Sequence, residues 1–585
     1  MAEPIYDPLK EYDQVFRDRF KQVAEQTFAD LAQAASVDVE ANRNTCATIY
    51  DVQGNKKEVD NQISMWNMLL VGLVVLVLGI GVFMYYTYSN SGFRPNGTIN
   101  PVNFFAGGLL VLGLAIFGAV KINRKRNDLR EESEILASQA ETLTRQAWQQ
   151  MQPLNRLFDW DVLARMITQT MPQVVFDPYF STRRVADLKR IYQWDEEDNE
   201  DSSVIFVHSG QINGNPFVLC RSLNMEWGTK VYRGSKTISW TTRERGADGK
   251  MQTVHHSETL YAYVEAPCPE YFESTRLIYG NTAAPDLVFD RMPNGLAGEE
   301  GSLRYRFNRR KLRKKARNLE NSDYAMLTNE EFEVAFDTSN RNNNQQFALL
   351  FTPMAQASML NLLKDKTNGY GDDFNFYKDH MINTIVPDHL QDIALDMNPA
   401  NYYSFDFDHS KRNFVVFNNE LFRAIYFTFA PLLCVPLYQQ HRPHHDIYGR
   451  NMQLQSAAWE HEAQANFWGQ QRFRHAKCET PSILKTTEVE RSGSKVKVKV
   501  AAHGFYTEQR LTYVRRRGGD GRTHQVPVYW DEYMPITGKG SLTLCEDPGF
   551  DDVACSVASR ADYIEKFLVD NQLQHYRKHM ASKCK

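Results

Sequence analysis

Residues 65–86 read MWNMLLVGLVVLVLGIGVFMYY, an uninterrupted run of 22 uncharged residues. A helix rises 1.5 Å per residue, so this run would extend about 33 Å, enough to cross the ~30 Å hydrocarbon core of a bilayer. A second uncharged run, PVNFFAGGLLVLGLAIFGAV, covers residues 101–120, and the polar linker of residues 87–100 joins the two. The pattern predicts a transmembrane helical hairpin within residues 63–122.

Basic residues are distributed unevenly around the two runs. The linker carries only Arg94, whereas three basic residues stand before the first run and five follow the second closely: Arg43, Lys56, Lys57, Lys121, Arg124, Lys125, Arg126 and Arg130. Cytoplasmic flanks of membrane spans are enriched in Lys and Arg, so both termini are predicted to lie in the cytoplasm. No ionisable residue of the Asp, Glu, Lys, Arg or His type interrupts either run. An ion pathway through this hairpin alone is therefore not expected.

Two alternatives compete with a membrane hairpin. A buried hairpin in a soluble core would need a large shell of protein around two fully apolar helices. A cleaved signal peptide would place its apolar region near residue 10 rather than residue 63. Both alternatives are less favoured than the membrane.

Length and composition bound the rest of the chain. The 585 residues, with a mass of 67.6 kDa, leave room for about three or four structural units. Apolar residues make up 42% and charged residues 24%, which excludes a wholly disordered chain. The net charge of -4 argues against a globally basic nucleic-acid binder, and nucleic acid is not an expected partner, although a local basic patch is not excluded. Eight cysteines without any CxxC motif fit neither a disulfide scaffold nor a zinc ribbon.

Two polar helices are predicted beside the membrane runs. Residues 8–36 carry most of their apolar side chains on one face. Residues 121–151 continue the second run, and apolar residues recur there every seven positions, at Ile122, Leu129, Leu136 and Leu143. This weak heptad leaves two interpretations open. The segment is an amphipathic helix lying on the main domain, or it is a projecting helix that pairs with residues 8–36 or with another protomer.

The rest of the chain mixes strand and helix patterns. Hairpins are predicted around the turns at residues 213–214, 246–249 and 518–521, and the alternating KVKVKV at residues 495–500 predicts a half-buried strand. Helices are predicted at residues 452–475 and 562–580. The fold class is therefore predicted to be α+β. A transmembrane helical hairpin precedes a large mixed α/β cytoplasmic region and a C-terminal β-meander plus helix.

The predicted organisation has seven parts. They are an N-terminal amphipathic helix and linker (1–62), the transmembrane hairpin (63–122), a juxtamembrane helix (123–172), a mixed α/β domain (173–303), a basic linker (304–323), an aromatic-rich α/β domain (324–450) and a C-terminal helix, β-meander and closing helix (451–585).

The stretch LTNEEFEVAFDTSNRNNNQQFALLFTPMAQASMLNLL covers residues 327–363. It resembles an uncharacterised family of bacterial membrane proteins that combine two N-terminal spans with a cytoplasmic α/β domain of unknown function. The resemblance extends over residues 60–430, departs after Asn451, and implies a bacterial inner-membrane location without any activity or catalytic residues. The residues that carry it are Glu331, Phe332, Glu333, Phe336, Leu350, Thr352, Pro353, Met354, Met359, Leu362 and Leu363.

These matching residues also have a physical interpretation of their own. Thr352 and Pro353 are predicted to open a helix, because Pro is tolerated in the first helical turn. The apolar residues nearby, namely Phe332, Phe336, Phe347, Leu349 and Phe351, are predicted to belong to the core. The stretch therefore indicates a fold and not a site.

The most unusual soluble feature is the basic run RYRFNRRKLRKKAR at residues 304–317. It contains nine cations: Arg304, Arg306, Arg309, Arg310, Lys311, Arg313, Lys314, Lys315 and Arg317. They could bind anionic lipid headgroups, each adding about 1 kcal/mol near such a surface. They could instead bind RNA or an acidic partner, with Tyr305 and Phe307 as stacking groups. The third interpretation is a solvated linker.

A cluster of histidines is the best metal candidate. His441, His444 and His445 lie close in sequence and His461 follows, and imidazole suits zinc or a similar metal. The spacing matches no standard site, so a polar loop whose histidines face solvent is the competing interpretation. The acidic run at residues 195–201 lacks the spacing of a calcium loop. No P-loop, nucleophile-elbow or dinucleotide-binding motif is present, and no cofactor is predicted.

These observations predict a membrane-anchored cytoplasmic binding or scaffold protein within a membrane-associated complex. The expected partners are membrane lipids and other membrane-associated proteins, and a homo-oligomer joined through the juxtamembrane helices is one arrangement. The alternatives are a membrane-bound metal-dependent hydrolase and an accessory subunit of a transport or envelope machine.

Overall fold

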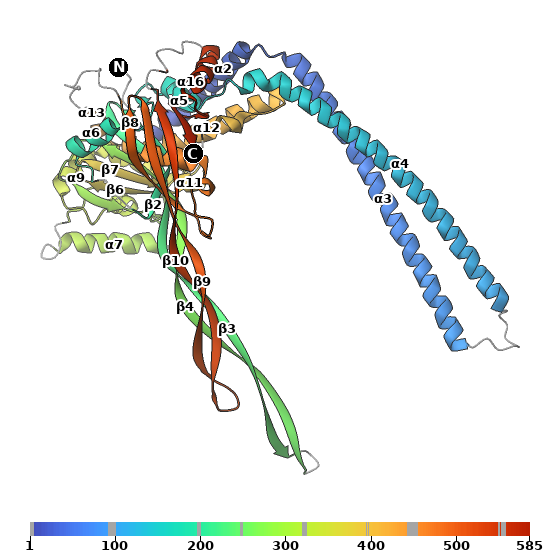
Figure 1. Ribbon diagram of the computed structural model, residues 1–585. Coiled ribbons are helices and arrows are strands. Elements are labelled where there is room, and N and C mark those ends of the chain that lie inside the picture. Colours follow the sequence, from blue (N-terminus) through green and yellow to red (C-terminus); the bar gives the residue numbers. More distant parts are fainter. Residues whose placement is uncertain are drawn as a thin grey trace. The chain divides into compact units, whose positions relative to one another are not determined.

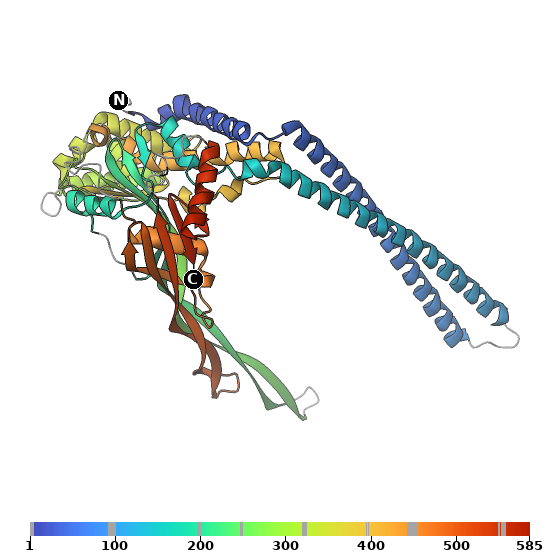
Figure 2. The same ribbon diagram turned by 45° about the horizontal axis from the view of Figure 1, so that its top comes forward.

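The structure, a computed structural model, describes residues 5–91, 101–195, 200–245, 250–318, 324–393, 395, 397–440, 454–547, 550 and 557–584. The chain forms two compact units. Unit 1 comprises Met1–Thr27, Asp159–Asn398 and Val415–Lys585, and unit 2 comprises Phe28–Phe158 and Pro399–Phe414. Figures 1 and 2 show the ribbon from two directions.

Two very long helices dominate unit 2 (Figure 1). They are α3, Val39–Ser91, and α4, Pro101–Asn155, which lie side by side. Each contains a segment that is long and apolar enough to cross a membrane, with mean hydropathies of 2.7 and 1.8. Only 0% and 6% of these apolar segments is buried inside the protein, so their apolar side chains are left exposed by the described part of the chain.

Beyond the apolar segments, α3 and α4 pack against each other through small and aliphatic side chains. Cys46 and Ile49 on α3 and Ala147 on α4 form a buried cluster. Ser133 on α4 donates a hydrogen bond of 2.7 Å to Asp60 on α3. The polar helix after the second run therefore pairs with α3, a partner that neither interpretation of the heptad included.

Unit 1 contains two antiparallel sheets. The first has the strand order β1-β2-β3-β4-β7-β6-β5 and the second the order β11-β12-β10-β9-β8. The strands are β1 (Val174–Phe176), β2 (Ser202–Ile212), β3 (Asn215–Arg245), β4 (Met251–Gly280), β5 (Val288–Arg291), β6 (Phe374–Asp379), β7 (Ile382–Pro387), β8 (Ile483–Ser492), β9 (Lys495–Arg517), β10 (Thr523–Glu546), β11 (His575–Tyr576) and β12 (Met580–Cys584).

Helices alternate with groups of strands along the chain. Those wholly within unit 1 are α1 (Pro8–Glu11), the π-helical turn Tyr12–Phe16, α5 (Val162–Thr170), α6 (Thr182–Tyr192), α7 (Leu303–Arg317), α8 (Glu330–Phe336), α9 (Asn344–Leu350), α10 (Pro353–Lys364), α11 (His389–Asp392), α13 (Pro436–Gln440), α14 (Ala458–Trp468), the 3-10 turn Gln470–Arg472 and α16 (Val557–Asn571). Unit 2 includes the 3-10 turn Pro399–Tyr402, and α2 (Arg17–Ala35) and α12 (Phe407–Leu433) contain residues of both units. This mixture of antiparallel sheets and separate helices confirms the α+β class.

The aromatic-rich core is built largely as predicted. Phe332, Phe336, Phe347 and Phe351 are fully buried, and their rings contact one another at centroid distances of 4.7 to 6.3 Å. The prediction for Leu349 is wrong, because its side chain is 59% exposed. In the short helix α9 the inward positions are Phe347 and Leu350, which turns residue 349 toward solvent.

The three predicted hairpins are present, and two are far longer than expected. β3 and β4 pair continuously from Phe217 opposite Tyr279 to Arg245 opposite Met251. β9 and β10 pair from Lys495 opposite Cys545 to Arg517 opposite Thr523. The outer halves of these hairpins lie side by side in both views (Figures 1 and 2). We call residues 230–245, 250–265 and 510–530 the stalk.

The C-terminal region contains β8, β9 and β10 as consecutive antiparallel neighbours, and its closing helix is shorter than predicted. Helix α16 ends at Asn571 rather than at residue 580, and the chain then forms β11 and β12. β12 pairs with β10, from Leu542 opposite Cys584 to Glu546 opposite Met580. Pairing with an existing sheet edge therefore overrides the local helical pattern. The helix predicted at residues 452–475 is likewise limited to α14.

Candidate functional site

The basic run forms helix α7 and not a linker, which corrects the expectation for residues 304–317. Ser302 caps the helix, since its hydroxyl oxygen accepts a hydrogen bond of 3.1 Å from the Tyr305 amide. Three cations, Lys314, Lys315 and Arg317, occupy the last turn. Positive charge is favourable there, because the C-terminal end of a helix carries partial negative charge.

The inner face of α7 packs onto the domain. Tyr305 and Leu312 are buried in a cluster with Leu296, Tyr324 and Val334. Burial of a large apolar side chain contributes about 1.5 to 3 kcal/mol, so these contacts hold the helix in place. Because Tyr305 is buried, it is not available to stack on a nucleic-acid base.

Three of the nine cations serve the domain itself. Arg313 makes a two-pronged ion pair with Glu330, with nitrogen–oxygen distances of 2.8 and 2.7 Å, and Arg309 lies 3.6 Å from the same carboxylate. The Lys315 ammonium donates a hydrogen bond of 2.6 Å to the Ser339 carbonyl oxygen. These three groups position the helix and are poor candidates for an external ligand.

The outer face of α7 combines exposed cations with exposed apolar groups. Leu303 is 81% exposed and Phe307 is 70% exposed, and their spacing of four places them on one helix face. Among the residues that the structure describes, the five remaining arginines and lysines other than Lys311 form no ion pair: Arg304, Arg306, Arg310, Lys314 and Arg317. Lys311 is also exposed and acts electrostatically on Asp337.

The outward stripe of α7 is polarised along the helix axis. Positions 303, 307, 310, 314 and 317 follow the helical spacing of three and four, so they share one side. The first two are apolar and the last three are basic. An interfacial helix has this composition, with large apolar side chains and cations on accessible positions.

The predicted histidine cluster receives no support from the described residues. His461 lies on α14 and is buried, and its Nε2 is 2.8 Å from the Ser456 hydroxyl. Burial lowers the pKa of His461. His441, His444 and His445 lie outside the described residues. Within the part of the chain that is described, no three His, Cys, Asp or Glu side chains are grouped to hold a metal ion.

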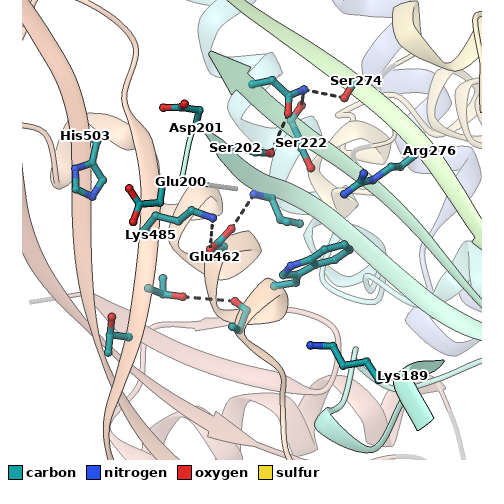
Figure 3. A pocket seen from close by; sticks show the side chains of 16 residues that line it. Lys189, Glu200, Asp201, Ser202, Ser222, Ser274, Arg276, Glu462, Lys485 and His503 are labelled. Atoms are coloured by element: carbon teal, nitrogen blue, oxygen red, sulfur yellow. Dashed lines mark hydrogen bonds and ion pairs between the residues drawn. The ribbon is translucent and has the colours of Figure 1, made fainter. Parts of the chain in front are cut away.

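Sequence reasoning missed a polar cavity of about 700 Å³ in unit 1 (Figure 3). Its lining comes from helices α6 and α14 and from several strands. In Figure 3, Glu200 and Asp201 lie on one side and Arg276 on the other. Between them the Lys485 ammonium lies 3.2 Å from the Glu462 carboxylate. No sequence motif could indicate the cavity, because its walls come from segments up to 314 residues apart, from Lys189 to His503.

The cavity lining combines charged and neutral polar side chains. Its charged lining also includes Lys189, and the Arg276 guanidinium lies over the Trp459 ring at 5.6 Å. Asn224 donates a hydrogen bond of 2.7 Å to the Ser274 hydroxyl. Among the described lining residues, no Ser or Cys is hydrogen-bonded to a His, so a nucleophile with its base is not formed.

Searches against protein families, curated proteins and solved structures each found no match. The resemblance to the bacterial membrane-protein family therefore stays a prediction.

Proposed function

We propose that this chain is a membrane-anchored cytoplasmic binding protein, a scaffold or component of a membrane-associated complex. In this proposal α3 and α4 cross the bacterial inner membrane, with both termini in the cytoplasm. Helix α7 binds the anionic surface of the cytoplasmic leaflet. The distribution of Lys and Arg around the spans supports this orientation. Lipids and other membrane-associated proteins are the proposed partners, with self-association as one form of assembly.

The outer face of α7 is the observation that carries the proposal. It presents cations without ion pairs among the described residues, together with two large apolar side chains that water surrounds. A solvated linker or an ordinary surface helix gains nothing from exposing Leu303 and Phe307 side by side. At a bilayer interface these two groups leave water while the cations meet lipid phosphates.

The expected energies are large enough to matter. Each cation near an anionic leaflet contributes about 1 kcal/mol, so five of them contribute roughly 5 kcal/mol before screening. Partial burial of Leu303 and Phe307 adds about 1 to 3 kcal/mol. The membrane spans hold the domain near the bilayer, which raises the effective concentration of the helix at that surface.

The test places an environment-sensitive fluorophore on the full-length chain at F307C, with the protein reconstituted in lipid nanodiscs. In discs that contain about a third anionic phosphatidylglycerol, we expect the emission to shift to shorter wavelength as the label enters the interface. In purely zwitterionic discs the shift should be small. The triple substitution R310Q, K314Q and R317Q should remove the shift, and 0.5 M salt should weaken it.

Two controls make the result specific. The same fluorophore at V569C, an equally exposed position on α16, should not respond to anionic lipid. The triple substitution R515Q, R516Q and R517Q removes the same charge from the stalk and should leave the shift at residue 307 unchanged. The lipid proposal is wrong if the label reports the same environment in anionic and zwitterionic discs.

A further inference from the structure

The stalk is strongly basic although the chain as a whole is not. Its residues include eleven Lys and Arg and four Asp and Glu, a net charge of +7, whereas the whole chain carries -4. Six of the eleven cations lie in residues 230–250 of the first hairpin, and the arginine-rich tip of β9 and β10 is about 250 residues away in sequence. Only the packing of the two hairpins brings them together.

The two hairpins hold each other through their inner faces. Ile238, Leu260 and Ala262 of the first pack against Val526 and Val528 of the second in one buried cluster. Gly234 permits the close approach, since a Cβ there would overlap the Pro527 carbonyl oxygen and lie 2.8 Å from the Val528 side chain. The outer faces of the two hairpins therefore remain accessible.

The outer face of β3 and β4 pairs arginine with tyrosine. Arg233 lies directly opposite Tyr263 in the ladder, and its guanidinium stacks over the Tyr261 ring at 3.9 Å. Both tyrosines are exposed. Arg243 lies on the same face of β3, since it is an even number of residues from Arg233.

The outer face of β9 and β10 repeats this combination. Tyr513, Arg515 and Arg517 alternate along β9, so they share one face, and all three are exposed. Leu511, on the same face, is paired with exposed Tyr529 of β10. Arg516 and Arg522 add two more exposed cations at the tip.

Some stalk cations are neutralised, but those near the tip are not. Arg510 pairs with Glu532 at 2.6 Å and Lys230 with Asp531 at 3.7 Å, and both pairs lie near the base. Within the described part of the stalk, no ion pair neutralises the tip arginines Arg243, Arg515, Arg516, Arg517 and Arg522. Positive charge therefore accumulates away from the domain.

We propose that the stalk binds single-stranded nucleic acid, with phosphates on the arginines and bases stacked on the exposed tyrosines. Cations that alternate with exposed aromatic rings along an extended surface are the arrangement that such binding requires. The alternation distinguishes this surface from α7, where the exposed apolar groups are Leu303 and Phe307 at one end of a helix. An acidic protein would meet the arginines but would not need the four tyrosines.

The test measures fluorescence anisotropy of a labelled 20-nucleotide oligo(U) with the full-length protein in zwitterionic nanodiscs, which removes anionic lipid as a competitor. We expect saturable binding that weakens steeply with salt. Contacts to about four phosphates would give a slope of roughly −3 in log K against log salt, or about a 60-fold loss between 50 and 200 mM.

Three variants locate the site. The triple substitution R515Q, R516Q and R517Q should weaken binding at least tenfold, whereas the matching lysine triple should retain most of it. The double substitution Y261A and Y263A should also weaken binding, by several-fold, without altering net charge. The α7 triple substitution R310Q, K314Q and R317Q is the control with equal charge loss, and it should leave oligo(U) binding unchanged.

Each contrary result overturns the inference. Equal losses in the stalk and α7 triples would show non-specific attraction. Full binding by the tyrosine double variant, with polyglutamate competing as well as oligo(U) at equal charge, would assign the stalk to an acidic protein. Absence of oligo(U) binding at 50 mM salt would remove the proposal outright, and the fluorophore test of α7 would be unaffected.

Discussion

At the scale of single residues, a buried histidine makes this fold sensitive to acid. His208 on β2 is 2% exposed, and its ring lies against the rings of Phe176 and Phe206. Burial, with Lys578 and Arg577 nearby, lowers the pKa of His208 well below its ordinary value of 6.5. Below about pH 6.5 the unfolded chain binds a proton at this residue and the folded chain does not. The contribution of His208 to the free energy of unfolding is therefore expected to fall as the pH falls.

The expected contribution of His208 is about 1.4 kcal/mol for each pH unit below 6.5, until its folded pKa is reached. The substitution H208F keeps a ring among the neighbouring rings and removes the titration. We expect H208F to lose less stability than the parent protein between pH 7 and pH 5.5, measured by thermal unfolding in detergent. H255F, at an exposed position on β4, should keep the parental pH dependence. Identical pH profiles for H208F and the parent would refute this account.

At the scale of elements, local sequence patterns predict most of the helices and hairpins that form between residues close in sequence. The helices that contain the two apolar runs, the strand pairs of the three hairpins and the helix opened by Thr352 and Pro353 are all predictable, because each depends on residues close in sequence. The helix predicted beyond Asn571 failed, since β12 pairs with β10 from a distant part of the chain. The basic run was expected to be a linker because its charge conceals two inward positions, Tyr305 and Leu312.

The pairing of α3 with α4 outside their apolar segments leads to a prediction about one isoleucine. Ile49 is fully buried against α4, and Ile135 on α4 is 52% exposed. I49A should destabilise this pairing by about 2 to 4 kcal/mol, since it removes buried methyl groups and leaves a cavity. Hydrogen exchange of residues 39–60 and 130–150 measures the effect. I135A is the matched control and should change little; equal protection in both variants would contradict the packing.

At the scale of the whole molecule, the sequence alone does not reveal which cations of α7 face solvent, nor that the arginines of the stalk lie together. The nine cations of α7 are contiguous, yet only the structure separates Arg309, Arg313 and Lys315, which serve the domain, from those that face solvent. The basic surface of the stalk is even harder to predict from the sequence, because its arginines come from two hairpins whose packing no local pattern encodes. The polar cavity is equally hard to predict from the sequence, because its walls also come from distant segments. Sites built from distant segments require the tertiary fold, and a single sequence contains no direct record of it.

The proposed anchoring of the whole chain in a membrane gives the last prediction. Val75 and Leu76 are exposed in the structure although they lie in the most apolar segment of α3, which is unfavourable in water and is relieved if lipid surrounds them. An arginine at the centre of a span costs about 2.5 to 3.5 kcal/mol on insertion, so the double substitution V75R and L76R should prevent stable insertion of α3. We expect the parent protein to remain in the membrane pellet after extraction at alkaline pH and the double variant to be released or degraded.

The control for this experiment introduces the same two charges at exposed positions outside the spans. V489R and V569R lie on β8 and α16, where both valines are more than half exposed to solvent. This variant should sediment with the membrane as the parent does, because neither position enters the bilayer. If the parent itself is extracted, the apolar surfaces of α3 and α4 must instead be covered by protein. The lipid contact proposed for α7 would then lose the tether that makes it effective.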